Sequence, residues 1–341
     1  MSWKKVRGHD SLVRAFEEVI RRGRLGHAYL FVGPRGVGKR LFAFELAKAL
    51  LCEADGDHLE ACDRCPGCLQ VEAGTHPDFV VAGRPEESLE VPIQTVREVC
   101  RSFGLKAVRG RGKVAILDDA DDLNDAAANC FLKTLEEPPP RSVLLLIGTS
   151  PERQLPTILS RCQIVHFPPL EDKLVAELLR GQGVEDPAMI ERLVSMSHGS
   201  VGEATALADP ALWEFRSQLL ESLAQPRPDS VAIGKRWTEF VEEAGTESSA
   251  QRRQAALALR LLIEFLNNVL ACSVGKIPDA APPGERKLLQ ELADRLGTDR
   301  ILQLLERCLQ ADLHIERRVQ LVLILEALGD ALGRQATAVP P

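Results

Sequence analysis

The sequence has no excess of positive charge and no long uninterrupted apolar stretch. Its formal net charge is −7, so no global basic field draws it to DNA or to an anionic membrane. Any nucleic-acid contact must use a local patch or a partner's surface. The first residues, from Met1 to Lys5, lack the apolar segment of a secretory signal, and no apolar run approaches the length of a membrane span. We therefore expect a cytoplasmic protein.

Cysteine is not scarce, and the nine cysteines of a cytoplasmic protein favour metal or structural roles over disulfides. Four of them follow the spacing C-x9-C-x2-C-x2-C, which suits a tetrahedral zinc ion held by thiolates: Cys52, Cys62, Cys65 and Cys68. His58 and His76 are possible substitute ligands, and reduced surface thiols are the alternative interpretation. The other five lie in apolar patterns that indicate core positions: Cys100, Cys130, Cys162, Cys272 and Cys308.

A short apolar run, Ala28 to Val32, breaks into a loop that carries glycines at 33, 36 and 38, and a helical pattern follows from Leu41. The spacing Gly33-x4-Gly38-Lys39 fits a P-loop, in which backbone N–H groups and the lysine hold phosphates. The next residue, Arg40, is not the Ser or Thr that would bind Mg²⁺. The alternative is a glycine-rich turn that binds no ligand.

Further short apolar runs alternate with helical patterns up to about residue 167, which predicts a doubly wound parallel sheet of five strands. The run from Lys113 to Leu117 ends in Asp118 and Asp119. In P-loop proteins the acid at this strand end holds Mg²⁺, and the next one polarises the attacking water. An acidic turn that caps the following helix is the alternative. Residues 53–74 read as an irregular polar stretch.

No strand pattern returns after Pro168. Three short helical patterns come first, and an all-helical block then runs from Pro210 to Arg334, with one long apolar helix from about Leu309 to Leu328. Apolar residues on more than one side of that helix suit burial in an assembly, and the core of a self-contained bundle is the rival explanation. The last residues, 335–341, are expected to be disordered.

Several motifs resemble those of bacterial clamp-loader subunits of DNA polymerase III. They include His27 to Phe31 before the loop, the four-cysteine insert and the segment from Ala73 to Asp78. The two longest matches are Ala126 to Pro139 and the stretch Leu-Pro-Thr-Ile-Leu-Ser-Arg-Cys-Gln that begins at Leu155. The resemblance is specific over residues 1–170, weaker over 171–210 and only architectural beyond.

The resemblance implies an α/β fold with an AAA+ P-loop module at 1–168 and a cysteine insert at about 52–68. A helical lid would follow at 169–209, and an all-α collar for oligomerisation at 210–334. It also implies partners: the motor subunits tau and gamma and a delta subunit in a five-membered ring, with the sliding clamp and primed DNA reached through that complex.

We expect phosphate or nucleotide contacts, by ATP or ADP that is not hydrolysed, from a set of loop and strand-end residues: Gly33, Gly36, Gly38, Lys39, Arg40, Asp118, Asp119 and Thr149. In this family the arginine of Ser-Arg-Cys reaches the ATP of the neighbouring subunit as an arginine finger, and here it is Arg161. From the residues alone, Arg161 has a second explanation, because it could neutralise the C-terminus of a short helix.

Three departures separate the chain from the motor subunits. Arg40 replaces the Mg²⁺-binding hydroxyl, Asp119 replaces the usual Glu, and Glu203 stands where motor subunits place a phosphate-sensing arginine. We therefore expect a subunit of the clamp loader with little or no ATPase activity of its own. An active motor subunit that uses Lys39 and Asp118 is the alternative. A stand-alone zinc module for nucleic acid is disfavoured, because the insert lacks interleaved basic and aromatic residues.

Overall fold

The computed structural model describes residues 2–54, 60–85, 88, 90–276 and 283–337. The chain divides into two compact units, which are described separately below. The first contains residues 1–185 and 197–204, and the second contains 186–196 and 205–341. The segment expected as a lid, 169–209, is thus divided between them. His58 and residues 338–341 of the expected tail lie outside the described residues.

The first unit contains a parallel sheet of five strands in the order β2-β3-β4-β1-β5, which confirms the predicted fold class. Each strand is short and rich in β-branched and leucine side chains. In the three central strands every residue is buried, as expected for a sheet covered on both faces. The strands are β1 (Ala28–Val32), β2 (Phe79–Ala82), β3 (Lys113–Leu117), β4 (Ser142–Ile147) and β5 (Gln163–His166).

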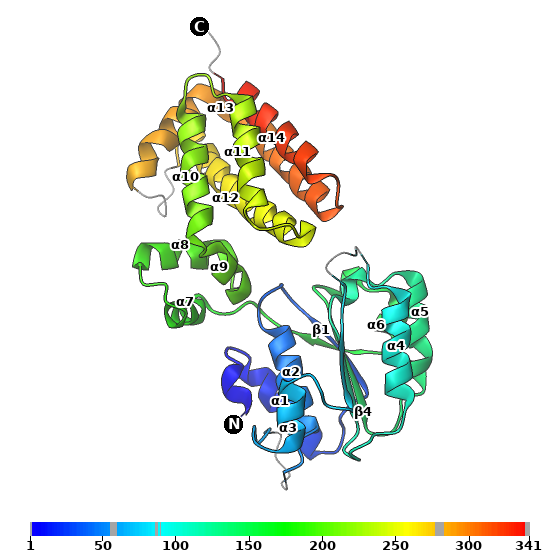
Figure 1. Ribbon diagram of the computed structural model, residues 1–341. Coiled ribbons are helices and arrows are strands. Elements are labelled where there is room, and N and C mark those ends of the chain that lie inside the picture. Colours follow the sequence, from blue (N-terminus) through cyan, green and yellow to red (C-terminus); the bar gives the residue numbers. More distant parts are fainter. Residues whose placement is uncertain (1, 55–59, 86–87, 89, 277–282, 338–341) are drawn as a thin grey trace. The chain divides into compact units, whose positions relative to one another are not determined.

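Helices cover both faces of this sheet (Figure 1). On one face α1 (Asp10–Arg21) and α2 (Lys39–Leu50) bury an aromatic cluster that includes Phe16, Phe31 and Phe42. On the other face α4 (Ile93–Gly104) and α5 (Asp125–Glu136) pack Val96 and Phe131 against the strands. The unit also contains α6 (Pro156–Leu159), α7 (Asp172–Gly181) and the start of α9 (Val201–Leu207), with single-turn helices η1 (Ser2–Lys5), η2 (Ala120–Asp122) and η3 (Pro151–Arg153).

The stretch 53–74 was expected to be irregular, and that expectation is wrong in part because Pro66–Glu72 forms helix α3. Pro66 occupies the first helical turn, where its missing N–H costs nothing. Cys65 caps the helix by accepting the backbone N–H of Cys68 through its sulfur. Lys48 of α2 anchors the segment around α3, because its buried ammonium group forms ion pairs with Asp63 at 2.8 Å and with Glu72 at 3.0 Å.

The regular structure of the second unit is entirely helical in the residues described. It consists of α8 (Pro187–Ser197), the end of α9, α10 (Pro210–Ala224), α11 (Ser230–Glu242), α12 (Ser248–Ser273), α13 (Pro283–Glu316) and α14 (Leu321–Gln335). Helix α13 breaks at Gly297, which has a φ of 69°. Helices α11 and α14 approach so closely that a Cβ atom on Gly329 would lie 2.7 Å from the Cα atom of Gly234. Glycine is therefore required at that crossing.

Two buried arginines join four helices of this unit. Arg216 on α10 makes two hydrogen bonds to Glu285 on α13, at 2.6 and 2.8 Å, and its guanidinium lies over the rings of Trp213 and Phe265. Arg192 on α8 contacts the same carboxylate at 3.4 Å. Because the network includes α8, this helix is held within the helical unit.

Two expectations for the helical part need correction. Helix α12 is long and apolar enough to cross a membrane by length and composition, although no run of that length was expected. The charged residues of its apolar stretch are Arg260 and Glu264, and the stretch also contains Asn267 and Asn268. Half of that stretch is buried within the bundle, which is typical of a core helix. The single apolar helix expected from Leu309 to Leu328 is two helices, because Arg318 adopts a left-handed conformation with a φ of 55° between α13 and α14.

Candidate functional site

The loop between β1 and α2 has the backbone of a phosphate cradle. Gly38 caps α2 in a left-handed conformation, with a φ of 102°. Gly33 has a φ of 148°, and a Cβ atom there would lie 2.2 Å from the backbone oxygen of Phe167. At Gly36 a Cβ atom would lie 2.4 Å from Ser200 Oγ, and the Gly36 carbonyl accepts the N–H of Gly202. Side chains are excluded at these positions, so the loop can present its backbone N–H groups.

Lys39 is folded back onto its own loop. Its Nζ atom donates to the carbonyl oxygens of Gly33 and Pro34, both at 2.6 Å, and the residue is 6% exposed. Burial lowers the pKa of Lys39 to about 8, against the opposing charges of Asp118 and Asp121. A phosphate would therefore have to compete with two backbone carbonyls for this ammonium group.

Arg40 pairs with the acid at the end of β3. Its Nη1 atom lies 3.4 Å from a carboxylate oxygen of Asp118. Burial and the neighbouring Asp119 raise the pKa of Asp118, while Arg40 and Lys39 act against that rise. An ion pair therefore occupies the place where a hydroxyl and a carboxylate would jointly bind Mg²⁺. The arrangement neutralises the acid without a metal.

The end of β4 meets the same acid cluster. Asp121 accepts hydrogen bonds from the Thr149 backbone N–H at 2.9 Å, from Thr149 Oγ1 at 2.5 Å and from Gln154 Nε2 at 2.5 Å. Asp119 has a left-handed backbone, with a φ of 55°. Sequence reasoning did not place Asp121 and Gln154 in the site. Asp121 follows the two acids predicted at this strand end, but its contact with Thr149 depends on the pairing of β3 with β4.

A cavity of about 290 Å³ joins these groups. Seven of the eight predicted phosphate or nucleotide contacts line it, together with Arg35, Asp121, Ile147 and Gly148. Gly33 does not line the cavity but accepts a hydrogen bond from Lys39. Glu203, half-buried in the first turn of α9, donates its backbone N–H to Ser200 Oγ. The predicted residues are thus brought together, and their roles toward a ligand stay a prediction.

Arg161 lies at the end of the sheet opposite to the phosphate loop. It follows α6 and precedes β5, whose Gln163 is aligned with Tyr29 of β1 in a parallel pair. Arg161 is therefore level with the start of β1, whereas the phosphate loop begins at Gly33, after its end. At a rise of about 3.3 Å for each residue of a strand, six residues separate the two levels by about 20 Å.

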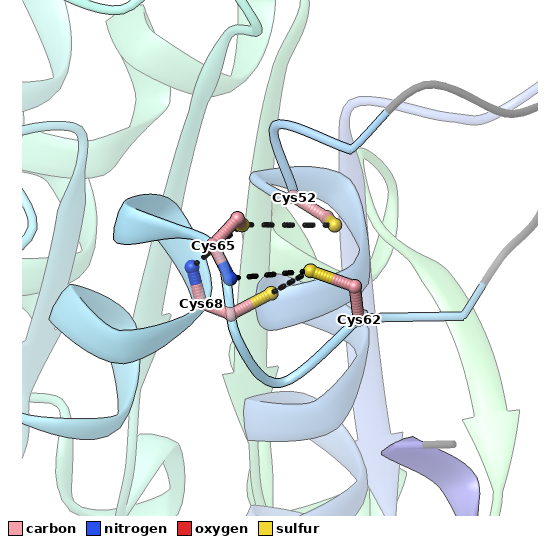
Figure 2. A group of neighbouring side chains, drawn as sticks. All are labelled: Cys52, Cys62, Cys65 and Cys68. Carbon is pink, nitrogen blue, oxygen red and sulfur yellow. Dashed lines mark hydrogen bonds between the residues drawn. The ribbon is translucent and has the colours of Figure 1, made fainter.

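Four cysteine sulfurs converge between α2 and α3, as Figure 2 shows. The Sγ atoms of Cys52 and Cys65 are 3.9 Å apart, those of Cys62 and Cys68 are 4.0 Å apart, and all four lie within 4.8 Å of one another. Four sulfurs bound at 2.3 Å to one tetrahedral zinc ion are separated by about 3.8 Å. The cluster can therefore hold a metal ion such as zinc with little rearrangement.

The surroundings of the cluster act differently on its thiols. Cys65 accepts the backbone N–H groups of Glu53 and Cys68, and Cys62 accepts that of Cys65. Backbone N–H groups, that of Arg64 first, lower the pKa of Cys62 to about 6. Burial raises the pKa of Cys52 and Cys68, so these two require a bound cation to lose their protons at neutral pH.

The remaining candidates for the cluster take other places. The Nδ1 atom of His76 accepts the backbone N–H of Asp78, and His76 does not belong to the group of sulfurs. Of the five cysteines expected in the core, Cys162, Cys272 and Cys308 are buried, whereas Cys100 and Cys130 are half-buried.

The fold and site define a parallel α/β protein with a P-loop-like cradle, a four-cysteine cluster and a helical second unit. A profile of the family described as "DNA polymerase III, delta subunit" matches residues 8–171. DNA polymerase III subunit delta′ of Escherichia coli K12 is 33% identical over 85% of this chain and 84% of its own length. The delta′ subunit of Pseudomonas aeruginosa is 31% identical over 90% and 92%.

The chain belongs to the delta′ subunit family of DNA polymerase III, which confirms the resemblance to clamp-loader subunits. Tau/gamma subunits match less of the chain: that of Haemophilus influenzae is 33% identical over 61% of this chain and 30% of its own length. Among solved structures, a DNA polymerase III gamma subunit-related protein from Thermotoga maritima covers 95% of this chain and 99% of its own, with 18% identity and a TM-score of 0.47.

Proposed function

We propose that the chain is a non-hydrolysing delta′ subunit of a bacterial clamp loader, which supplies Arg161 to the ATP bound by a neighbouring motor subunit. The observation that carries this proposal is the separation of about 20 Å, from strand register, between the level of Arg161 and the chain's own loop. An extended arginine side chain spans less than half of that distance. In a head-to-tail ring, such an edge faces the nucleotide of the next subunit.

The chain's own site supports the loss of hydrolysis. Arg40 and Asp118 form an ion pair in place of a Mg²⁺ site, and Lys39 is engaged by loop carbonyls. The hydroxyl group of Thr149 donates its hydrogen bond to Asp121. Metal-assisted transfer of a phosphoryl group needs a bridging cation and a positioned water. The backbone N–H groups of the cradle would still hold ATP or ADP, without hydrolysis.

Zinc is the metal we propose for the cysteine cluster. Four thiolates form a closed tetrahedral shell with no open position for a substrate, which is typical of structural zinc sites. The metal would be held by Cys52, Cys62, Cys65 and Cys68 and would fix the insert between α2 and α3. No step of clamp loading is assigned to it.

We propose the helical unit as the collar through which the chain joins tau or gamma and delta. Its last two helices and the turn that joins them carry exposed apolar side chains that a partner would cover: Leu302, Leu309, Leu313, Val319, Val322 and Leu323. A groove of about 600 Å³ lies between these helices. The sliding clamp and primed DNA would be reached through the assembled ring.

The decisive experiment compares Arg161→Ala with Lys39→Ala in the complex reconstituted with the motor and delta subunits. Arg161→Ala should reduce turnover at the one site it serves by roughly 10³-fold or more, as arginine fingers do, and should leave assembly intact. Lys39→Ala should change clamp loading far less, because its own site does not hydrolyse ATP. The reverse ranking would show that the chain is a motor subunit.

A further inference from the structure

The guanidinium of Arg161 is held by three neighbours (Glu136, Thr157 and Ser160). Its Nε and Nη2 atoms both donate to the same carboxylate oxygen of Glu136, at 3.1 and 2.5 Å. Its Nη1 atom donates to the Thr157 carbonyl at 3.2 Å and to Ser160 Oγ at 2.9 Å. Arginine has five N–H donors, so these four contacts leave one donor over.

The position of Glu136 is electrostatically unfavourable unless Arg161 is counted. Glu136 is the last residue of α5, and the C-terminal end of a helix repels a carboxylate. Its side chain is about half exposed and pairs with Arg161 at 2.5 Å. The cation is held at the amino end of the sheet, since His27 before β1 also contacts this end of α5 through the Leu135 carbonyl.

We propose that Glu136 is a positioning residue. It holds the guanidinium of Arg161 in a resting position, the parked state, until the γ-phosphate of a neighbouring nucleotide displaces the Glu136 carboxylate. This inference rests on the proposed role of Arg161 in trans. A phosphate is best bound by two parallel N–H donors of one guanidinium. Both edges that offer such pairs are engaged, and Glu136 occupies the one formed by Nε and Nη2.

The contacts to Thr157 and Ser160 give the parked state its second function. They hold the Nη1 atom of Arg161 through Thr157 of α6 and through Ser160, the residue after that helix. The Arg161 side chain therefore stays at the edge of the sheet when its contact with Glu136 breaks. The action of Arg161 therefore depends on the state of the complex. In the resting complex Glu136 competes with the γ-phosphate for the guanidinium, and the γ-phosphate displaces Glu136 once the ring tightens on clamp and DNA. Idle hydrolysis at the neighbouring site is suppressed.

The test is Glu136→Gln in the reconstituted complex, with Glu137→Gln as the matched control. Both variants remove one negative charge from the same helix end, and the described contacts join only Glu136 to Arg161. Without clamp and DNA, Glu136→Gln should raise ATP turnover at the neighbouring site about two- to fivefold, the factor that an exposed ion pair is worth. Turnover with clamp and primed DNA should equal that of the wild type, and so should the melting temperature of the chain.

A double variant separates this inference from the proposed function. If Glu136 acts through Arg161, the effect of Glu136→Gln should vanish in an Arg161→Ala background. A silent Arg161→Ala would overturn the trans role itself. If Arg161→Ala is severe but Glu136→Gln matches Glu137→Gln, the finger stands and the parking contact is refuted. Reduced turnover by Glu136→Gln under both conditions would also refute parking, because Glu136 would then aim the finger.

Discussion

Replacing Cys65 by serine tests how far the cysteine insert depends on a metal. Cys65 provides one sulfur of the cluster, caps α3 and accepts two backbone N–H groups. Fixing the backbone of the five residues from Ala61 to Cys65 costs about 5–10 kcal/mol in conformational entropy. Among the described residues of the insert, the buried apolar material besides the cysteines is one alanine, Ala61, and burial of its methyl group returns about 1 kcal/mol.

A metal must therefore supply most of the remaining free energy, and structural zinc binds to peptides with about 10–16 kcal/mol. We expect the purified protein to hold one zinc ion per chain and Cys65→Ser to lose it. Hydrogen exchange should then show loss of protection over residues 60–72, with strands β1, β3 and β4 unchanged. The Cys100→Ser variant is the control, because a hydroxyl can still donate to the Cys130 carbonyl.

Two results would refute this reasoning. Freshly reduced protein that contains no zinc by elemental analysis would show that the sulfurs serve another purpose. Normal protection of residues 60–72 in metal-free Cys65→Ser would show that the ion pairs of Lys48 with Asp63 and Glu72 hold the insert without a metal.

Three further predictions follow from the site and from the helical unit. The isolated chain should show no Mg²⁺-dependent ATP hydrolysis above background, and clear turnover would contradict the ion-paired site. Leu323→Glu, on the exposed apolar face, should abolish co-purification with the motor subunits, whereas Val231→Glu, which is 77% exposed on α11, should not. Arg216→Ala should cost about 3–5 kcal/mol, as removal of one partner from a buried ion pair does, measured by urea unfolding. Burial alone would raise the pKa of Glu285, but its contacts with Arg216 lower that pKa. The stability that this pair provides is therefore complete above the unfolded pKa of about 4.5 and is lost as the pH falls below that value. Equal stability of wild type and variant at pH 6 would contradict the prediction.

The sheet could be predicted from the sequence because its strands leave a strong local signal. β1 and β3 are buried on both faces, and their bounds were predicted to the residue: β1 is an unbroken apolar run, and β3 is an apolar run that begins with Lys113. Helix α3 was missed because it is seven residues long and begins with Pro66 and Gly67, both of which usually indicate a loop. The turn at Arg318 was missed because an arginine gives no local sign of a left-handed backbone.

The candidate site was predictable as a set of residues but not as a set of contacts. Spacing and strand ends were enough to bring Lys39, Asp118 and Thr149 into one cavity. Their partners were not predictable, because each contact depends on three-dimensional neighbours. Lys39 turns toward the carbonyls of its own loop, and Thr149 meets Asp121 across two strands that are 25 residues apart in the chain.

The parallel sheet explains how the proposed loss of hydrolysis and the proposed role of Arg161 can occur in one chain. All five strands run the same way, so loops that follow strands gather at one end and segments that precede them gather at the other. The cradle with Arg40 and Asp118 lies at the carboxyl end, and Arg161 with Glu136 lies at the amino end. We therefore expect substitutions in the cradle to leave the geometry of Arg161 unchanged, so the proposed loss of hydrolysis is compatible with the proposed role of Arg161 at a neighbour's nucleotide.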